Sequence, residues 1–529
     1  MLSDYKNGVI ANYGPATLSG SALALSFPTW HLYPLAWLAL IPLLIQTGQA
    51  KPLAAAAKFF IAGFAFHLIL LQWLLSNIYW GGGWAVWGYI GLCLIMSVYW
   101  ALTGAAWRLT SGALPRLPAW VTLPIFWFAM ETVQARLFTG FGWGALGYAQ
   151  GPDLRLVQWA AIGGVSLVSA ILVTVNGMAA HAYHRRKLRW PALLGALTVI
   201  ILSHVGGGIM MDTPDYDSNP YAAGLIQPDY PLETKWDREY TLDMVENAAE
   251  KSRMLVDVAG PVDLLVWPEA HVMGDVHRPG ILPTIARLTQ DIDTFLYTGA
   301  HRSNSETGGS FNSSYLIDPD GEIIAQYDKI HLAPFGEYVP LSQFFPFIAK
   351  VVPAIGDIES GTDQTTLKTN AKTVGPLICF EVLFAPMAET LRDSGAELLV
   401  VITNLAWFGS SNAIPQELEI ARLRAIETRL PLAHCANTGV SGMFDPWGRF
   451  DDVDLYVGAG GPVNRPDLPQ VAKVAQRFAG RFPVAAPGRR LIPGGPVNVP
   501  RVALVLACLL LIIGLWRRFE SSAKPIASP

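Results

Sequence analysis

Apolar residues fall into blocks along the chain. The sequence is almost continuously apolar up to about Gly208, has the composition of a soluble protein from there to Val497, and is apolar again from Val499. The stretch Gly458–Pro500 is rich in proline and glycine, as flexible connections are. The pattern therefore predicts a membrane domain at 1–208, a globular domain at 209–457, a linker at 458–499, and a last membrane helix with a tail at 500–529.

Runs long enough to cross a bilayer, which requires roughly 20 predominantly apolar residues, precede and follow the globular domain. They lie at Ala11–Phe27, Trp30–Gln46, Leu53–Leu75, Trp84–Trp107, Ala119–Arg136, Leu156–Ala180, Pro191–Val205 and Val502–Trp516. The first run is short and glycine-rich, as part of a cleaved signal peptide can be, but it lacks a strongly basic start and an obvious small-residue cleavage site. We expect it to be retained, which gives about eight spans.

Basic residues mark one side of the predicted membrane domain. Lys51, Arg108, Arg116, the run Arg185–Lys187 and the pair Arg517–Arg518 fall in alternate connections, all on the side of the N-terminus. Cytoplasmic loops of membrane proteins carry an excess of lysine and arginine. We therefore expect a multi-pass protein of the bacterial cytoplasmic (inner) membrane with both termini in the cytoplasm and the globular domain in the periplasm.

Short β-rich runs alternate with helical patterns in the globular domain. The runs Ala222–Gln227, Val262–Trp267 and Thr294–Gly299 have strand character, whereas Asp237–Ala259 and Pro283–Gln290 have helical patterns. This alternation predicts an α/β sandwich.

Composition agrees with a membrane protein and excludes other classes. The chain is 52% hydrophobic and 15% charged, with a mean hydropathy of +0.33. A net charge of −4, with no zinc-finger spacing or glycine-rich phosphate loop, argues against a nucleic-acid partner. The four cysteines are far apart, and two of them lie in predicted spans, so they indicate no disulfide framework.

Cys379 is the candidate nucleophile. It directly follows the apolar strand Gly375–Ile378, and a strand end can present a nucleophile, although a buried core thiol is the alternative for a single cysteine. Two other strand ends carry Glu269 and Lys329. A carboxylate can take the thiol proton and return it to a leaving group, and a lysine can stabilise both a thiolate and an oxyanion. Together these side chains predict acyl transfer through a thioester.

These three residues resemble the Glu-Lys-Cys triad of the nitrilase (carbon-nitrogen hydrolase) superfamily. Further motifs and the spans on both sides resemble the apolipoprotein N-acyltransferases, the membrane-embedded family with this domain. The motifs are Phe335-Gly336-Glu337-Tyr338-Val339-Pro340, Cys379-Phe380-Glu381, Ala406-Trp407-Phe408-Gly409 and Thr139-Gly140-Phe141-Gly142-Trp143. The resemblance covers nearly the whole chain and implies a polytopic α-helical membrane domain beside a nitrilase-like α-β-β-α sandwich.

The resemblance also implies an activity and its residues. The acyl chain would move from the sn-1 position of a membrane phospholipid to Cys379, and then to the α-amine of the N-terminal diacylglyceryl-cysteine of an apolipoprotein. Glu269 would be the base and Lys329 the oxyanion partner, while Glu337 and Glu381 would orient Lys329 or the incoming amine. Supporting or substrate-binding positions would be Trp236, Phe380 and Trp407, with Trp236 near the acyl chain and simple packing as its alternative.

The stretch between Leu341 and Ile355 is too apolar for an ordinary exposed loop. It contains Phe344, Phe345, Phe347 and Ile348. We interpret it as a flap that dips into the bilayer beside the site, so that lipid tails need not cross water. A buried helix is the alternative.

Three positions depart from the family pattern. Leu405 stands where an acid is expected, Phe380 replaces a common tyrosine, and Glu417 stands where a histidine often follows the glutamine. The changes concern recognition of the acceptor more than the triad, and Glu417 could stand in for the acid missing at position 405. They leave open two alternatives: a membrane-tethered nitrilase-type amidase that transfers the acyl group to water, and a catalytically silent lipid-binding relative.

The expected partners are a membrane phospholipid as donor, a diacylated apolipoprotein as acceptor, and the bilayer itself. A monomer fits a self-contained site. No cofactor is expected for thioester chemistry. No metal is expected either, because His271, His301 and His331 lack ligand spacing.

Overall fold

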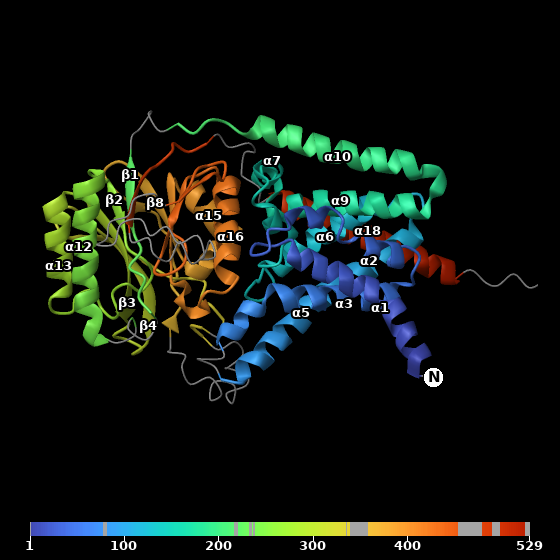
Figure 1. Ribbon diagram of the computed structural model, residues 1–529, viewed down its shortest axis with the longest axis horizontal. Helices are drawn as coiled ribbons and strands as arrows, with labels where there is room; N and C mark the ends of the chain where they lie inside the picture. Colours follow the sequence, from blue (N-terminus) through green and yellow to red (C-terminus); the bar gives the residue numbers. More distant parts are fainter. Residues whose placement is uncertain are drawn as a thin grey trace, which may run out of the picture. The chain divides into compact units, whose positions relative to one another are not determined.

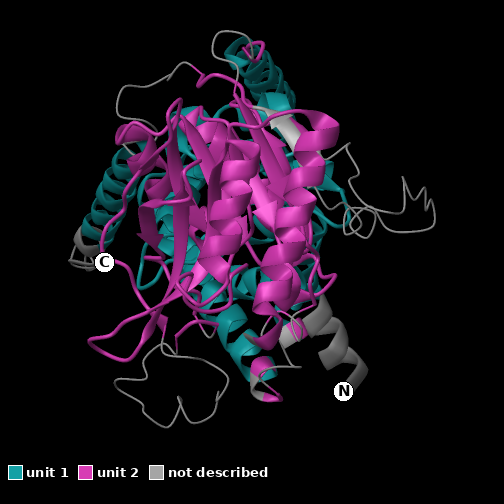
Figure 2. Ribbon diagram, turned by 90° about the vertical axis from the view of Figure 1, so that its left-hand side faces the viewer, with its two compact units in different colours: residues 1–75, 86–211, 491–529 teal, residues 76–85, 212–490 magenta. Residues whose placement is uncertain are grey.

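The computed structural model divides into two compact units (Figures 1 and 2). A helical unit comprises Met1–Leu75, Val86–Met211 and Leu491–Pro529, and a sandwich unit comprises Ser76–Ala85 and Asp212–Arg490. The structure describes residues 2–77, 82–215, 221–231, 235, 238–334, 336–338, 358–452, 479–488 and 498–523.

The helical unit contains helices at all the positions of the predicted spans. Its α-helices are α1 (Leu2–Leu25), α2 (Ile41–Thr47), α3 (Pro52–Leu70), α5 (Trp84–Ala113), α6 (Ala119–Gln134), α7 (Leu154–Val157), α8 (Ala160–Gly163), α9 (Val165–His184), α10 (Arg189–Met210) and α18 (Asn498–Ala523). Among the described residues, five segments are long and apolar enough to cross a membrane: Pro52–Leu70, Ala85–Ala113, Val165–His184, Arg186–Met210 and Val499–Arg518. This confirms the polytopic helical domain. The predicted number of about eight spans is approximate, because five of the described segments meet the length and composition of a span.

The second predicted span is broken. It consists of a 3-10 helix, η1 (Tyr33–Trp37), followed by the short helix α2, and each has a proline at its start. Proline has no N–H to donate, so it fits the first turn of a helix but not its interior. Asn176 of α9 compensates for the break, because its amide accepts from Leu40 N at 2.9 Å and donates to the Ala36 carbonyl at 2.9 Å. Backbone groups in an apolar layer need such internal partners.

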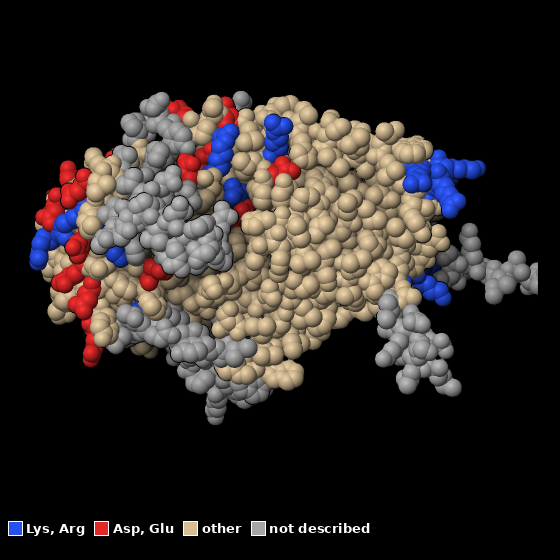
Figure 3. Space-filling model, viewed as in Figure 1, with Lys and Arg blue, Asp and Glu red and all other residues tan. Residues whose placement is uncertain are grey.

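Charged side chains are sparse on the helical unit. In the view of Figure 3 its surface is almost entirely uncharged, and the Lys and Arg atoms gather mostly at one end. Arg185, Arg186 and Lys187 lie between α9 and α10, at the end of the unit where these two helices join (Figure 1). An uncharged belt with basic residues at its edge is what a bilayer requires.

The sandwich unit contains two β-sheets (Figure 1). The first has the order β13-β1-β2-β3-β4-β5, with β6 paired to β4, and the second has the order β12-β11-β10-β9-β8-β7. The strands of the first sheet are β1 (Ala222–Ile226), β2 (Leu264–Val266), β3 (Phe295–Ser303), β4 (Ser310–Ile317), β5 (Ile323–Asp328), β6 (Ile358–Glu359) and β13 (Ala479–Pro483). Those of the second are β7 (Leu367–Lys368), β8 (Thr373–Ile378), β9 (Leu398–Thr403), β10 (Leu432–Ala436), β11 (Gly442–Phe444) and β12 (Phe450–Asp452).

Helices cover the outer face of each sheet. Helices α12 (Thr241–Ala259) and α13 (Ile281–Ile292) pack on the first sheet, and α15 (Ala385–Asp393) and α16 (Ala413–Thr428) pack on the second (Figure 1). The layers therefore follow the order α-β-β-α. This confirms the predicted nitrilase-like sandwich.

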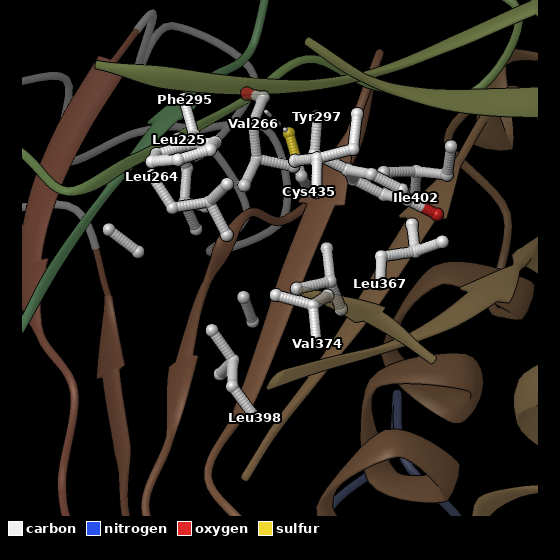
Figure 4. Packing of buried hydrophobic residues seen from close by; sticks show 14 of the residues in the cluster. Leu225, Leu264, Val266, Phe295, Tyr297, Leu367, Val374, Leu398, Ile402 and Cys435 are labelled. Atoms are coloured by element: carbon white, nitrogen blue, oxygen red, sulfur yellow. Dashed lines mark hydrogen bonds between the residues drawn. The ribbon is translucent and has the colours of Figure 1, made fainter. Parts of the chain in front are cut away.

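The two sheets enclose one apolar layer (Figure 4). Leu264 and Val266 of β2 contribute to it from the first sheet, and Val374 of β8 with Leu398 and Ile402 of β9 contribute from the second. All five side chains are fully buried. Strands buried on both faces have near-continuous apolar sequences, which is why these runs were recognisable.

The predicted linker at 458–499 is partly wrong. Its described part includes β13, which pairs antiparallel with β1 in the register Ala222↔Pro483 to Ile226↔Ala479. Proline and glycine in Ala479–Pro483 concealed a short strand because this strand lies at the edge of the sheet, where fewer of its backbone groups must bond to a neighbour.

Leu398→Ala should destabilise the sandwich unit by about 2–5 kcal/mol, because truncation leaves a cavity between the sheets. The measurement is pulse proteolysis of the detergent-solubilised chain in a urea series. Val258→Ala is the matched control, because Val258 is 66% exposed. Equal urea midpoints for the two variants would contradict the assignment of Leu398 to a tightly packed core.

Candidate active site

Three strand ends bring the predicted triad together. Glu269 follows β2, Lys329 directly follows β5, and Cys379 directly follows β8. Glu269 Oε1 lies 3.3 Å from Lys329 Nζ, and both charges act electrostatically on the Cys379 thiol. Because β2 and β5 belong to one sheet and β8 to the other, the cluster combines side chains from both sheets.

The loop that carries Glu269 lies directly against β3. A Cβ on Gly299 would fall 2.6 Å from the backbone N of Ala270 and 2.8 Å from the Cα of Glu269. Only glycine allows this approach. The loop is fixed further because Trp267 N donates to the Tyr297 carbonyl at 2.9 Å.

Lys329 is a buried cation between two carboxylates. Its Nζ lies 2.9 Å from Glu337 Oε2 and 3.3 Å from Glu269 Oε1, and the lysine side chain is 1% exposed. Burial disfavours the ammonium, but Glu337 and Glu269 outweigh it and hold the pKa of Lys329 well above its usual range. Lys329 is therefore a permanent positive charge near neutral pH.

Glu337 and Glu269 share an amide donor. Asn312 Nδ2 donates to Glu269 Oε1 at 2.8 Å and to Glu337 Oε1 at 2.7 Å, and Ala333 N donates to Glu337 Oε2 at 2.7 Å. Burial opposes ionisation of Glu337, yet Lys329 and the N–H groups bring its pKa below the ordinary value. Glu337 thus contacts Lys329, and its charge balances that of the lysine.

Cys379 has a strained backbone and a neutral thiol. Its φ is +53°, in the left-handed region that non-glycine residues seldom adopt, and such strain is typical of active sites. Burial and the Glu269 carboxylate raise the thiol pKa well above its usual range, while Lys329 acts in the opposite direction. The thiol therefore keeps its proton at rest, and a base must remove it during a reaction.

Glu381 joins the ends of β5 and β8. Its Oε1 accepts from Tyr327 OH at 2.7 Å, Ile330 N at 2.8 Å and His331 N at 3.1 Å, and its Oε2 accepts from Ile378 N at 2.8 Å. The side chain is completely buried. It therefore fixes the backbone beside Lys329 and beside Cys379, and so orients the lysine through its neighbours in the chain.

Two polar residues of the site were missed in the sequence. Lys235 Nζ donates to the Glu269 carbonyl at 2.6 Å, and burial lowers its pKa to about 7 while Glu269 and Cys379 act to raise it. Asn312 is the other. The sequence offered two signals: Lys235 lies beside Trp236, and Asn312 is a single amide within the buried strand β4. Both signals are weak, because most lysines and asparagines are solvated.

The structure describes the positions of some of the remaining predicted residues. The Phe380 ring packs edge-on against Phe384 at 5.4 Å, and Trp407 is half-buried in the 3-10 helix η7 (Leu405–Phe408). Leu405 is fully buried in an apolar cluster. Trp236 and the flap residues Phe344, Phe345, Phe347 and Ile348 lie outside the described residues.

Cys435 is a core residue. Its sulfur lies within the apolar layer (Figure 4), 3.4 Å from the carbonyl oxygens of Ile226 and Val266. Within the described ranges, His, Cys, Asp and Glu form no group of three or more that could hold a metal ion.

The chain is similar to known proteins along most of its length. A model of the apolipoprotein N-acyltransferase N-terminal domain matches residues 19–178, and the carbon-nitrogen hydrolase model matches residues 222–450. The apolipoprotein N-acyltransferase of Geobacter metallireducens is 34% identical, over 83% of this chain and 86% of that protein. The apolipoprotein N-acyltransferase of Chlorobaculum tepidum is 29% identical, over 82% of this chain and 86% of that protein.

A solved structure also matches part of the chain. Saccharomyces cerevisiae Nit3, a member of the nitrilase superfamily, is 17% identical with a TM-score of 0.35, over 45% of this chain and 87% of that chain.

Lys235 should make stability depend on pH. Its pKa falls from 10.5 to about 7 on folding, so between these values the unfolded chain binds more protons and stability rises with pH. Lys235→Met removes the titrating group and should flatten this rise between pH 7 and pH 10. The measurement is the urea midpoint of the sandwich unit at each pH, with Lys368→Met at an exposed position as control. If the urea midpoint of Lys235→Met rises with pH as much as that of the unaltered chain, Lys235 is not a buried amine that titrates on folding.

Proposed function

The chain belongs to the apolipoprotein N-acyltransferase family and is an acyltransferase of lipoprotein N-acylation, and from this premise we propose that Cys379 carries the acyl group as a thioester. The observation that supports the proposal is the buried cluster of Glu269, Lys329 and Cys379. It joins a base, a permanent cation and a nucleophile whose proton must be removed. This is the set that acyl transfer through a thiol requires.

In the first half-reaction the donor is a membrane phospholipid. The Cys379 sulfur attacks the carbonyl carbon of the sn-1 ester while its proton passes to Glu269. The oxyanion of the tetrahedral intermediate is stabilised by Lys329, and one such donor can contribute about 3 kcal/mol. The carbon–oxygen bond then breaks, and the proton on Glu269 passes to the oxygen of the lysophospholipid that leaves.

In the second half-reaction the acceptor is the α-amine of the N-terminal diacylglyceryl-cysteine of an apolipoprotein. The amine nitrogen attacks the thioester carbon, and one amine proton passes to Glu269. The carbon–sulfur bond breaks, and the proton returns to Cys379. Glu337 keeps the charge of Lys329 balanced throughout, because its carboxylate contacts the lysine at 2.9 Å.

We also propose the orientation in the bacterial membrane. The basic residues in alternate connections support both termini in the cytoplasm of an inner-membrane protein, with the sandwich unit in the periplasm. A monomer is also proposed, because the cluster around Lys329 takes all its residues from one chain.

Incubation of the purified enzyme with phospholipid vesicles should add one fatty acyl group to the peptide that contains Cys379. Intact-mass and peptide mass spectrometry measure the adduct. A diacylated lipopeptide added next should consume the adduct and gain an amide-linked acyl chain. Glu269→Gln should slow adduct formation by roughly 100-fold or more, because the thiol loses its base, and Cys379→Ala should form none.

Three results would overturn this proposal. An adduct on another residue, or unimpaired transfer by Cys379→Ala, would exclude the thioester. Release of free fatty acid instead of the acylated lipopeptide would indicate that water is the acceptor. Lys58→Met, in α3 and outside the sandwich unit, is the control for general loss of folding.

Lys368→Cys should react with a membrane-impermeant maleimide in intact spheroplasts, whereas Lys187→Cys should react only after lysis. Both side chains are exposed, and both variants are made in a chain whose native cysteines are replaced by alanine. The reverse labelling pattern would place the sandwich unit in the cytoplasm.

A further inference from the structure

A second buried carboxylate lies behind the nucleophile. Thr403 ends β9, which runs parallel to β8 with Ile402 opposite Ile378, so Thr403 lies beside Cys379. Its hydroxyl donates to Glu417 Oε1 at 3.0 Å, and a hydrogen bond from the same hydroxyl to the Cys379 sulfur acts to lower the thiol pKa. Thr403 is completely buried and Glu417, near the start of α16, is 3% exposed. The catalytic steps described above use neither side chain.

His434 of β10 faces the same carboxylate. Its Nδ1 lies 2.8 Å from the Val440 carbonyl, which can only accept, so Nδ1 carries a hydrogen. Its Nε2 lies 3.6 Å from Glu417 Oε1.

The Thr403 hydroxyl has one proton and two neighbours that compete for it. While the proton points to Glu417, the hydroxyl offers the Cys379 sulfur only a lone pair, and a lone pair favours the protonated thiol. A thiolate would instead require the hydroxyl to turn its proton toward sulfur. The Glu417 carboxylate opposes that turn, and its charge raises the thiol pKa in the same direction.

We propose that Glu417 is a positioning residue that holds the Thr403 hydroxyl proton away from Cys379 and so keeps the thiol protonated until Glu269 removes its proton. The inference rests on the proposed role of Cys379. When the thiolate forms, its proton goes to Glu269 and the Thr403 hydroxyl turns from Glu417 to sulfur. The Thr403 hydroxyl therefore stabilises the thiolate only once Glu269 has taken the thiol proton.

The charged groups around the thiol come from several elements. Glu269 follows β2 and Lys329 follows β5, and Glu417 lies on α16. Lys235 also acts electrostatically with Cys379. Glu417 itself faces Thr403 and His434. Substitution of Glu417 therefore removes one of the charges that act on the thiol and leaves the triad in place.

The test is the rate of Cys379 alkylation by iodoacetamide against pH, measured by peptide mass spectrometry in the full-length protein without lipid. Glu417→Met removes the acceptor and frees the Thr403 proton for sulfur. The profile should move to lower pH by about one unit, which is a roughly ten-fold faster reaction at pH 7. Glu417→Gln should give less than half of this shift, because its carboxamide oxygen still accepts from Thr403.

A double-mutant cycle tests the route through the hydroxyl. In a Thr403→Val background, Glu417→Met should produce less than half of its usual shift, and in a Thr403→Ser background the shift should return. Glu419→Met is the matched control, because Glu419 lies on the same helix but pairs with Arg422 at 2.7 Å.

Coincident profiles for the unaltered chain, Glu417→Met and Glu417→Gln would overturn the inference, as would an undiminished shift in the Thr403→Val background. If Glu417→Met does not fold, Glu417→Gln is compared in the unaltered, Thr403→Val and Thr403→Ser backgrounds, and the same outcomes decide. Alkylation needs no acyl donor, so its outcome is independent of whether phospholipid acylates Cys379.

Discussion

One buried carboxylate joins the two sheets at the end where the functional side chains lie. Glu381 has no exposed surface, and its two oxygens accept from four donors on segments that flank Lys329 and Cys379. A buried carboxylate is stable only with such partners, and each donor left without an acceptor would cost about 1–3 kcal/mol. The positions of Lys329 and of Cys379 therefore depend on the same side chain.

The site holds one group that is charged at rest, the Lys329 ammonium, and one that is neutral at rest, the Cys379 thiol. Lys329 lies between Glu269 and Glu337, which hold its pKa high, whereas burial and Glu269 hold the pKa of Cys379 high and leave the thiol neutral. Opposite charges at short distance in a water-poor site stabilise one another strongly. Lys329 is therefore charged at rest, whereas Cys379 becomes charged only when its proton moves.

Much of the architecture was predictable because it follows from burial. Apolar runs in the sandwich unit became β2, β8 and β9, and the strand ends at Glu269, Lys329 and Cys379 converge because strands in one sandwich end at a common edge. The resemblance to a family supplied Glu337 and Glu381. Local patterns could not reveal Lys235, Asn312 or Thr403, because their importance comes from partners 34, 43 and 14 residues away in the chain. The edge strand β13 was missed for a related reason, since its partner β1 lies far away in sequence.

The apolar layer between the sheets has a mechanical consequence. Glu269 extends from the end of one sheet and Cys379 from the end of the other, so the thickness of the packed layer determines how far Glu269 lies from Cys379. Packed side chains in such a layer are nearly incompressible. The layer therefore acts as a spacer between the two strand ends, and the volumes of remote side chains such as Val374 and Leu398 contribute to that spacing.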